Sequence, residues 1–241
     1  IKQSQFRHCR LAQNPVRFES MGNVLRLSDS HCCLARKTSP LVEDELILTV
    51  LRTIRDAQEN GFFADGRVCS CFAIARQEVQ VGAKKSHWMW YVWPSLSCVR
   101  SNVRYPQFLL PNLDAARAYV MDPVLAERLV SITQMATAHL KAGVNPKALF
   151  GKQHKYDVPK FREAMIVFAV AAQLNGNETQ KDIFVDGLRA LGTLALDDNT
   201  FEVLNKTFAS DEVSAIQQEI VTVSSRQVKY HSCEKMSGVK K

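Results

Sequence analysis

The chain has 241 residues, of which 46% are hydrophobic and 23% charged, and its formal net charge is +7. These fractions are typical of a soluble globular protein that is large enough to bury a hydrophobic core. No apolar stretch reaches the roughly 18 to 20 residues that a membrane-spanning helix needs, so no transmembrane segment is predicted.

The positive charge lies at the two ends of the chain. Residues 1–40 carry seven Lys and Arg against two acidic residues, and residues 205–241 carry six against four. Residues 41–204 carry eighteen charges of each sign. A nucleic-acid-binding domain carries its positive surface on its own scaffold, so this distribution argues against a nucleic-acid partner.

Residues 1–40 are rich in Arg, Ser, Gln and Asn and show no sustained hydrophobic period. This composition indicates a basic N-terminal extension or the remnant of a targeting segment. The seven cysteines are odd in number and include no C-x-x-C pair, which favours reduced thiols over a disulfide framework or a zinc site. We therefore expect an intracellular protein, in an organelle such as the mitochondrion or plastid, with the cytoplasm as the alternative.

Helix signals begin at Ser39 and Pro40, a cap followed by a first-turn proline, and an apolar face continues through Ile47, Leu51 and Ile54. Gly61 and Gly66 bound a predicted loop over residues 61–66. A second helix is predicted over residues 68–81. No β-hairpin signal is present.

The most distinctive segment is the aromatic run 88–93, which contains all three tryptophans of the chain. Every position in it is apolar, so periodicity does not distinguish a strand from a buried helix. Pro94 ends the segment in either case. If the run is helical, Trp90 and Trp93 share one face and Trp88 and Tyr91 another, so at most half of these rings line one pocket.

Further along the chain, Asn112, Asp122 and Asn145 have the character of helix N-caps, and Pro123 and Pro146 follow two of them in the first helical position. Apolar stripes at helical spacing follow at Leu125, Leu129, Ile132 and Met135; at Phe161, Met165, Phe168 and Ala172; at Ile183, Phe184, Leu188 and Leu191; and at Val213, Ile216, Ile220 and Val223. The first stripe also contains His139, which we interpret as a core or boundary residue. These patterns predict an all-α fold: a single multihelical globular domain of about seven helices over residues 41–204, with a helical tail over 205–241 that has a basic end.

Several segments together resemble the domain-of-unknown-function family 1810. The similarity is carried by residues 56–59, 85–94, 113–120, 123–125, 128–129, 150–151, 157 and 160–162, with Met165 and Phe168. The Ser-His-Trp-x-Trp motif at 86–90 is its most specific part. The resemblance implies an all-α domain with no established activity.

The chain departs from the family pattern at two places. The loop 96–105 lacks the pair of glycines that the family usually has before an Arg-x-Tyr motif. Glu163, Ala164 and Ile166 stand where the family tends to have hydroxyl side chains. An acid beside Lys160 and Arg162 suggests that an internal ion pair replaces a bound anion. Asp157 and Lys160, one helical turn apart, are predicted to form a surface pair.

Two interpretations of the aromatic run stay open. In the functional one, an ammonium, a hydroxyl and an imidazole at 85–87 surround an aromatic pocket that takes a phosphate or carboxylate. In the structural one, Ser86 caps a helix, His87 bonds a buried carbonyl and the aromatics fill the core. The candidate ligand-binding residues are Lys85, Ser86, His87, Trp90, Arg104, Tyr105 and Lys160. No catalytic residue, metal ligand or cofactor is predicted.

Two functions follow from these interpretations. The sequence favours a non-enzymatic interaction or structural subunit. Such a subunit would belong to a larger organellar assembly and have other protein subunits as partners. The alternative is a small-molecule-binding protein or enzyme that acts on an anionic, nucleotide-like ligand in the aromatic pocket. A cleft lined by Lys85, His87, Arg104 and Lys160 favours the second function, and a region filled by Trp90, Met165 and Ile166 favours the first.

Overall fold

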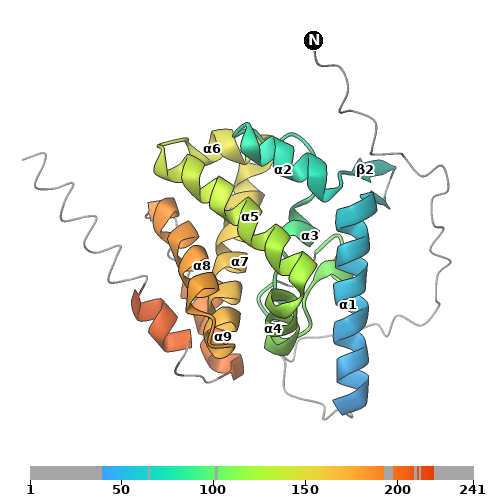
Figure 1. The fold of residues 1–241 in the computed structure, drawn as a ribbon, viewed down its shortest axis with the longest axis vertical. Coiled ribbons are helices and arrows are strands. Elements are labelled where there is room, and N and C mark those ends of the chain that lie inside the picture. The colour runs from blue at the N-terminus through green and yellow to red at the C-terminus, as the bar shows by residue number, and fades with distance from the viewer. Residues whose placement is uncertain are drawn as a thin grey trace, which may run out of the picture.

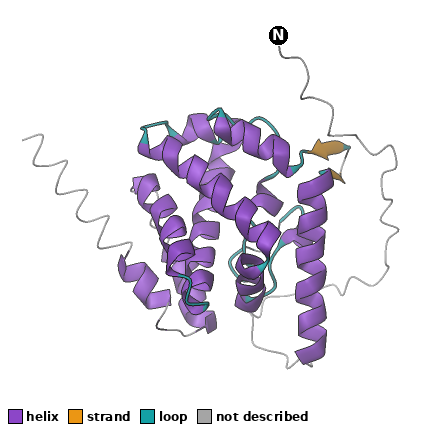
Figure 2. Cartoon of the chain, viewed as in Figure 1, coloured by secondary structure: helices purple, strands orange, loops and turns teal. Residues whose placement is uncertain are grey.

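The computed structural model describes residues 40–64, 66–100, 103–192, 198–208, 211 and 213–219. The chain runs through α1 (Pro40–Asn60), β1 (Phe62–Ala64), β2 (Arg67–Cys69), α2 (Phe72–Gln80), α3 (Met89–Val92), η1 (Pro106–Phe108), α4 (Leu113–Met121), α5 (Pro123–Lys141), α6 (Pro146–Leu149), η2 (Gly151–Gln153), α7 (His154–Leu174), α8 (Glu178–Leu191) and α9 (Asp198–Phe208). Residues 213–219 are also helical. The predicted all-α class is confirmed, and the two short strands are a minor element beside the helices (Figure 2).

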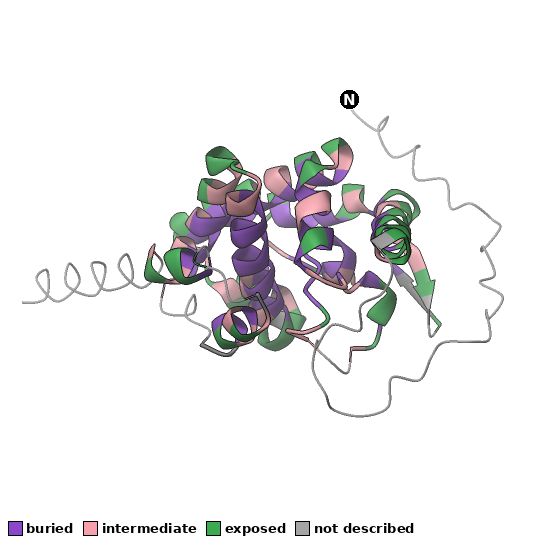
Figure 3. Cartoon of the chain, turned by 90° about the horizontal axis from the view of Figure 1, so that it is seen from below, coloured by how far each residue is buried: buried purple, intermediate pink, exposed green. Residues whose placement is uncertain are grey.

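Helix α7 is the central element of the fold. Every residue from 161 to 172 except Arg162 is buried. A helix that is apolar around most of its circumference lies inside a domain rather than on its surface. α7 packs against α8 and α4, while α5 crosses the front of the molecule and α1 forms the side opposite α8 (Figure 1). Seen from below, the buried residues gather in the middle of the bundle and the exposed ones on its outer faces (Figure 3).

The three predicted N-caps are confirmed. Asn112 Oδ1 accepts a hydrogen bond of 2.9 Å from a backbone N–H in the first turn of α4. Asp122 Oδ1 accepts two such bonds at the start of α5, and Asn145 Oδ1 accepts one of 2.8 Å at the start of α6. Pro123 and Pro146 occupy the first turns of α5 and α6, where a missing N–H costs nothing. Capping depends on neighbours two or three residues apart, which explains why the sequence predicts it well.

The segment after α1 differs from its prediction. In place of a loop over residues 61–66 and a helix from Val68, the chain forms an antiparallel hairpin of β1 and β2 in which Phe62 pairs with Cys69, and α2 begins only at Phe72. Strands of three residues are too short to show an alternating pattern, so the sequence carries no signal for them. Gly61 has a φ of +77° and passes close to the Cys69 carbonyl, a path that a side chain would block.

The predicted apolar stripes lie in the core where the structure describes them. Those of α7 and α8 are buried apart from Ile183, and Val213 and Ile216 are buried as well. His139 lies at the edge of the core, with a ring nitrogen 3.2 Å from the Gln80 carbonyl oxygen. Residues 1–39, which contain the predicted N-terminal extension, and residues 220–241, which contain the basic end of the tail, lie outside the described residues.

Candidate functional site

A cavity of about 380 Å³ opens where α3, the loop that follows it and the start of α7 meet. Its lining holds four cationic side chains but only one carboxylate. The cations are Lys84, Arg100, Arg104 and Lys160, and the carboxylate is that of Asp157. We call this hollow the cationic cavity.

Five of the seven candidate ligand-binding residues line the cationic cavity, although they come from segments up to 73 positions apart: His87, Trp90, Arg104, Tyr105 and Lys160. Lys85 and Ser86 do not line it. In place of Lys85, the preceding residue Lys84 lines the cavity, and its side chain is buried.

Lys85 and Ser86 serve the site through their backbone. Both N–H groups donate to Oε2 of Glu78 on α2, at 2.9 and 3.0 Å, and Trp88 Nε1–H donates to the same oxygen at 2.8 Å. Burial of the Glu78 carboxyl raises its pKa, but these hydrogen bonds outweigh burial and hold the pKa below its ordinary value. Glu78 thus fixes the turn that leads into α3. The sequence does not indicate this role of Glu78, because an acid in an ordinary helix carries no local signal of it.

Ser86 does not cap the helix that follows. α3 begins at Met89, its N-cap is Trp88, and no side chain caps it. The alternative that the motif is a helix cap is therefore wrong. His87 contributes its carbonyl oxygen, which accepts a hydrogen bond of 3.0 Å from the Tyr91 hydroxyl, and its ring lies on the cavity side.

Asp157 holds two ammonium groups. Its Oδ2 lies 2.8 Å from Lys84 Nζ and its Oδ1 accepts a hydrogen bond of 3.0 Å from Lys160 Nζ. The predicted pair of Asp157 and Lys160 forms, but it does not lie at the surface, because both side chains are buried. Burial lowers the pKa of Lys160, as do the nearby Arg100 and Lys84, while Asp157 opposes this shift; the net direction is downward.

Glu163 forms an internal ion pair, but its partner is Arg100. Arg100 Nε donates to Glu163 Oε2 at 2.8 Å and Nη2 donates to Oε1 at 2.5 Å, and Ser95 Oγ lies 3.2 Å from the same carboxylate. The expected internal ion pair of Glu163 forms, but with Arg100 from the loop after α3, while Lys160 is bonded to Asp157 one turn earlier on α7. Arg100 belongs to the loop that lacks the family's glycines.

The three tryptophans separate into core and cavity positions. Trp88 and Trp93 are fully buried and lie 5.5 Å apart, whereas Trp90 is half-buried and lines the cavity. Trp90 is in contact with Lys160 Nζ, 4.5 Å from its ring centroid, and with the edge-on ring of Tyr105 at 4.9 Å. The predicted sharing of a face by Trp90 and Trp93 does not hold, because α3 has only four residues and Trp93 lies beyond its end.

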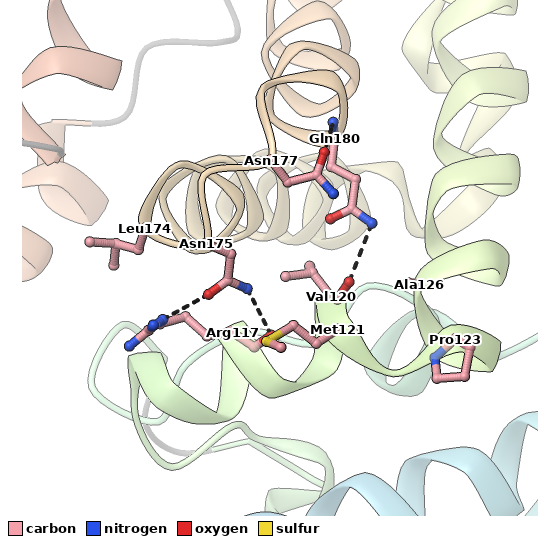
Figure 4. A pocket seen from close by; sticks show the side chains of 9 residues that line it. All are labelled: Arg117, Val120, Met121, Pro123, Ala126, Leu174, Asn175, Asn177 and Gln180. Carbon is pink, nitrogen blue, oxygen red and sulfur yellow. Dashed lines mark hydrogen bonds between the residues drawn. The ribbon is translucent and has the colours of Figure 1, made fainter.

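A second hollow, of about 610 Å³, lies between α4, the start of α5 and the turn from α7 to α8 (Figure 4). Its polar groups bond one another. Arg117 Nε donates to Asn175 Oδ1 at 2.9 Å, Asn175 Nδ2 donates to the Arg117 carbonyl at 3.2 Å, and Gln180 Nε2 donates to the Val120 carbonyl at 3.2 Å (Figure 4). These bonds join the helices, so we interpret this hollow as a packing seam.

The part of the chain that the structure describes holds neither a cluster of metal ligands nor a membrane-spanning helix. No group of three or more His, Cys, Asp or Glu side chains there is arranged to hold a metal ion. No helix within the same residues combines the length and the apolar character needed to cross a membrane.

Two ammonium groups share one carboxylate at the cationic cavity. Lys84 and Lys160 both contact Asp157. Arg100 is paired with Glu163. Guanidinium and ammonium groups in a partly enclosed hollow attract phosphate and carboxylate, since a low local dielectric strengthens such contacts. The arrangement is therefore suited to an anion that rests against an aromatic wall.

Comparison with known proteins identifies a family but no activity. A family model described as "Protein of unknown function (DUF1810)" matches residues 56–202. Among solved structures, the conserved hypothetical protein Rv1873 from Mycobacterium tuberculosis is 24% identical, with a TM-score of 0.47 over 59% of this chain and 86% of that one. No curated protein matches.

Proposed function

The chain belongs to the DUF1810 family, whose function is unknown, and from the geometry of the cationic cavity we propose that this protein binds a small anionic molecule there. The observation that carries the proposal is that two buried ammonium groups at the hollow, those of Lys84 and Lys160, share the single carboxylate of Asp157. A surplus of buried or half-buried positive charge is costly unless an anion compensates it.

The size and the walls of the cavity support a ligand with two different parts. A volume of about 380 Å³ is within the range of small-molecule sites, which is roughly 300 to 1,000 Å³. Arg104 lies in the loop after α3 and lines the cavity, where its planar guanidinium can donate to a phosphate or carboxylate. Met89, Trp90 and Tyr105 form an apolar wall for the rest of the molecule, which is compatible with a nucleotide-like ligand.

The alternative role as a structural subunit in an organellar assembly stays a prediction. Met165 and Ile166 are fully buried in the core and do not line the cavity. Of the four residues that the sequence criterion names for the binding function, His87, Arg104 and Lys160 line the cavity and Lys85 does not, so the criterion supports this function in part.

The experiment is a thermal-shift screen of the full chain against inorganic phosphate, nucleotides and phosphorylated metabolites, since a ligand that binds the native state raises Tm. Arg104→Gln is the informative variant, because this side chain is exposed and its loss leaves the core intact. We expect it to weaken binding about tenfold, which corresponds to roughly 1.4 kcal/mol. Arg76→Gln, an exposed arginine on α2, is the matched control and leaves binding unchanged. Equal weakening by both variants, or no shift with any anion, would refute the proposal.

A further inference from the structure

We infer that the side-chain amine of Lys160 forms a Schiff base with a small anionic aldehyde or ketone held in the cationic cavity. The inference rests on the proposed anion binding and adds to it a reactive group and a class of ligand. It is carried by the placement of one amine among cations, an aromatic ring and a single carboxylate.

Lys160 differs from an ordinary surface lysine in its surroundings. Its side chain is 11% exposed, it lines the cavity, and its Nζ lies 4.5 Å from the centroid of the Trp90 ring. Desolvation and neighbouring cations favour the neutral form of an amine, which is the form that attacks a carbonyl carbon. Burial, Arg100 and Lys84 act in this direction on the pKa of Lys160.

The second amine at the site is less accessible. The side chain of Lys84 is 3% exposed, and its Nζ lies 5.2 Å from the centroid of the Trp88 ring, which belongs to the core. Trp90, in contrast, lines the cavity. A carbonyl compound that enters the cavity therefore meets Lys160 first, while Lys84 keeps its contact with Asp157.

The reaction balances without any further reagent. Lys160 loses a proton to become the free amine, its nitrogen lone pair forms a bond to the carbonyl carbon, and the carbonyl oxygen becomes the hydroxyl of a carbinolamine. Return of the proton expels this hydroxyl as water and leaves a protonated imine. The ammonium and the protonated imine carry the same charge, so Asp157 Oδ1, 3.0 Å from Nζ, pairs with either one.

The test uses pyridoxal 5′-phosphate as an anionic aldehyde, followed by borohydride reduction and peptide mapping of the full chain. We expect the label on Lys160 to exceed that on the exposed Lys141, Lys147 and Lys155, and inorganic phosphate to slow it. Pyridoxal, which lacks the phosphate, labels Lys160 about tenfold more slowly, since a phosphate contact of roughly 1.4 kcal/mol gives that factor.

Variants and controls separate the two proposals. Lys160→Arg keeps the positive charge beside Asp157 but forms no imine, so it loses the label, whereas Lys147→Arg keeps it. A label spread evenly over the exposed lysines of the wild-type chain would overturn the inference, and this result needs no variant. If phosphate still raises Tm in that case, only the Schiff base is refuted; if phosphate has no effect either, the proposed anion binding also fails.

Discussion

Replacement of Glu78 by glutamine tests whether one buried carboxylate holds the turn that leads into the cavity. The substitution keeps the length of the side chain and one oxygen acceptor but removes the charge. Glu78 Oε2 now accepts hydrogen bonds from Lys85 N–H, Ser86 N–H and Trp88 Nε1–H, and of these donors the Trp88 indole is fully buried.

The expected loss of stability follows from these three bonds. A hydrogen bond to a charged group contributes about 1 kcal/mol more than a neutral one, so the three together lose about 3 kcal/mol. Part of this loss is offset, because burial disfavours the charged form of Glu78 and the glutamine carries no charge. The pKa of Glu78 is nevertheless lowered, so the bonds outweigh burial, and we expect Glu78→Gln to cost about 1 to 2 kcal/mol.

The dependence on pH gives the sharper measurement. Because the pKa of Glu78 is lower in the folded state than in the unfolded one, its stabilisation is present above the ordinary carboxyl pKa and is lost as pH falls through the folded value. The free energies of unfolding of wild type and Glu78→Gln, measured in urea, should therefore differ more at about pH 7 than at about pH 4. The control is Glu127→Gln at an exposed position on α5, which should change the free energy of unfolding by less than about 0.5 kcal/mol at either pH. An unchanged difference between the two pH values would refute the reasoning.

Two further substitutions test contacts near the cavity by urea unfolding. Gly151 has a φ of +65°, and a Cβ there lies 2.3 Å from the Lys84 carbonyl oxygen, so Gly151→Ala should cost at least about 2 kcal/mol more than Gly143→Ala, where φ is +83° and nothing lies within 4 Å. Equal losses would contradict the steric argument. Thr133→Val removes the acceptor of a 3.0 Å bond from Trp93 Nε1, and we expect a loss of about 1 to 3 kcal/mol because this buried donor is left unpaired. Unchanged stability would show that the indole finds another partner.

Local patterns and long-range contacts differ in how well the sequence predicts them here. The caps at Asn112, Asp122 and Asn145 and the apolar stripe of α7 rest on residues two to four positions apart, and all are confirmed. The hairpin after α1 was not predicted, because its strands have three residues each. In the aromatic run, hydrophobic periodicity does not distinguish a strand from a helix, since every position is apolar.

The candidate site was predicted in part. His87, Trp90, Arg104, Tyr105 and Lys160 were identified from residue type and family resemblance, and all five line one cavity. The ion pairs were predicted in part: Asp157 bonds Lys160, and Glu163 is in an internal ion pair, but its partner is Arg100. A spacing of three residues indicates that Asp157 and Lys160 meet, but it does not show that α7 is covered, and therefore it does not show that the pair is buried.

The sequence by itself determined the helical class of this protein and the starts of several helices, because each of these depends on neighbours within one or two turns. Only the tertiary structure decided that Arg100 pairs with Glu163, 63 positions away, and that Glu78 on α2 holds the turn before α3. The cationic cavity is of the second kind. Its charge balance depends on which side chains come into contact across the fold, and the packing of the whole domain determines these contacts.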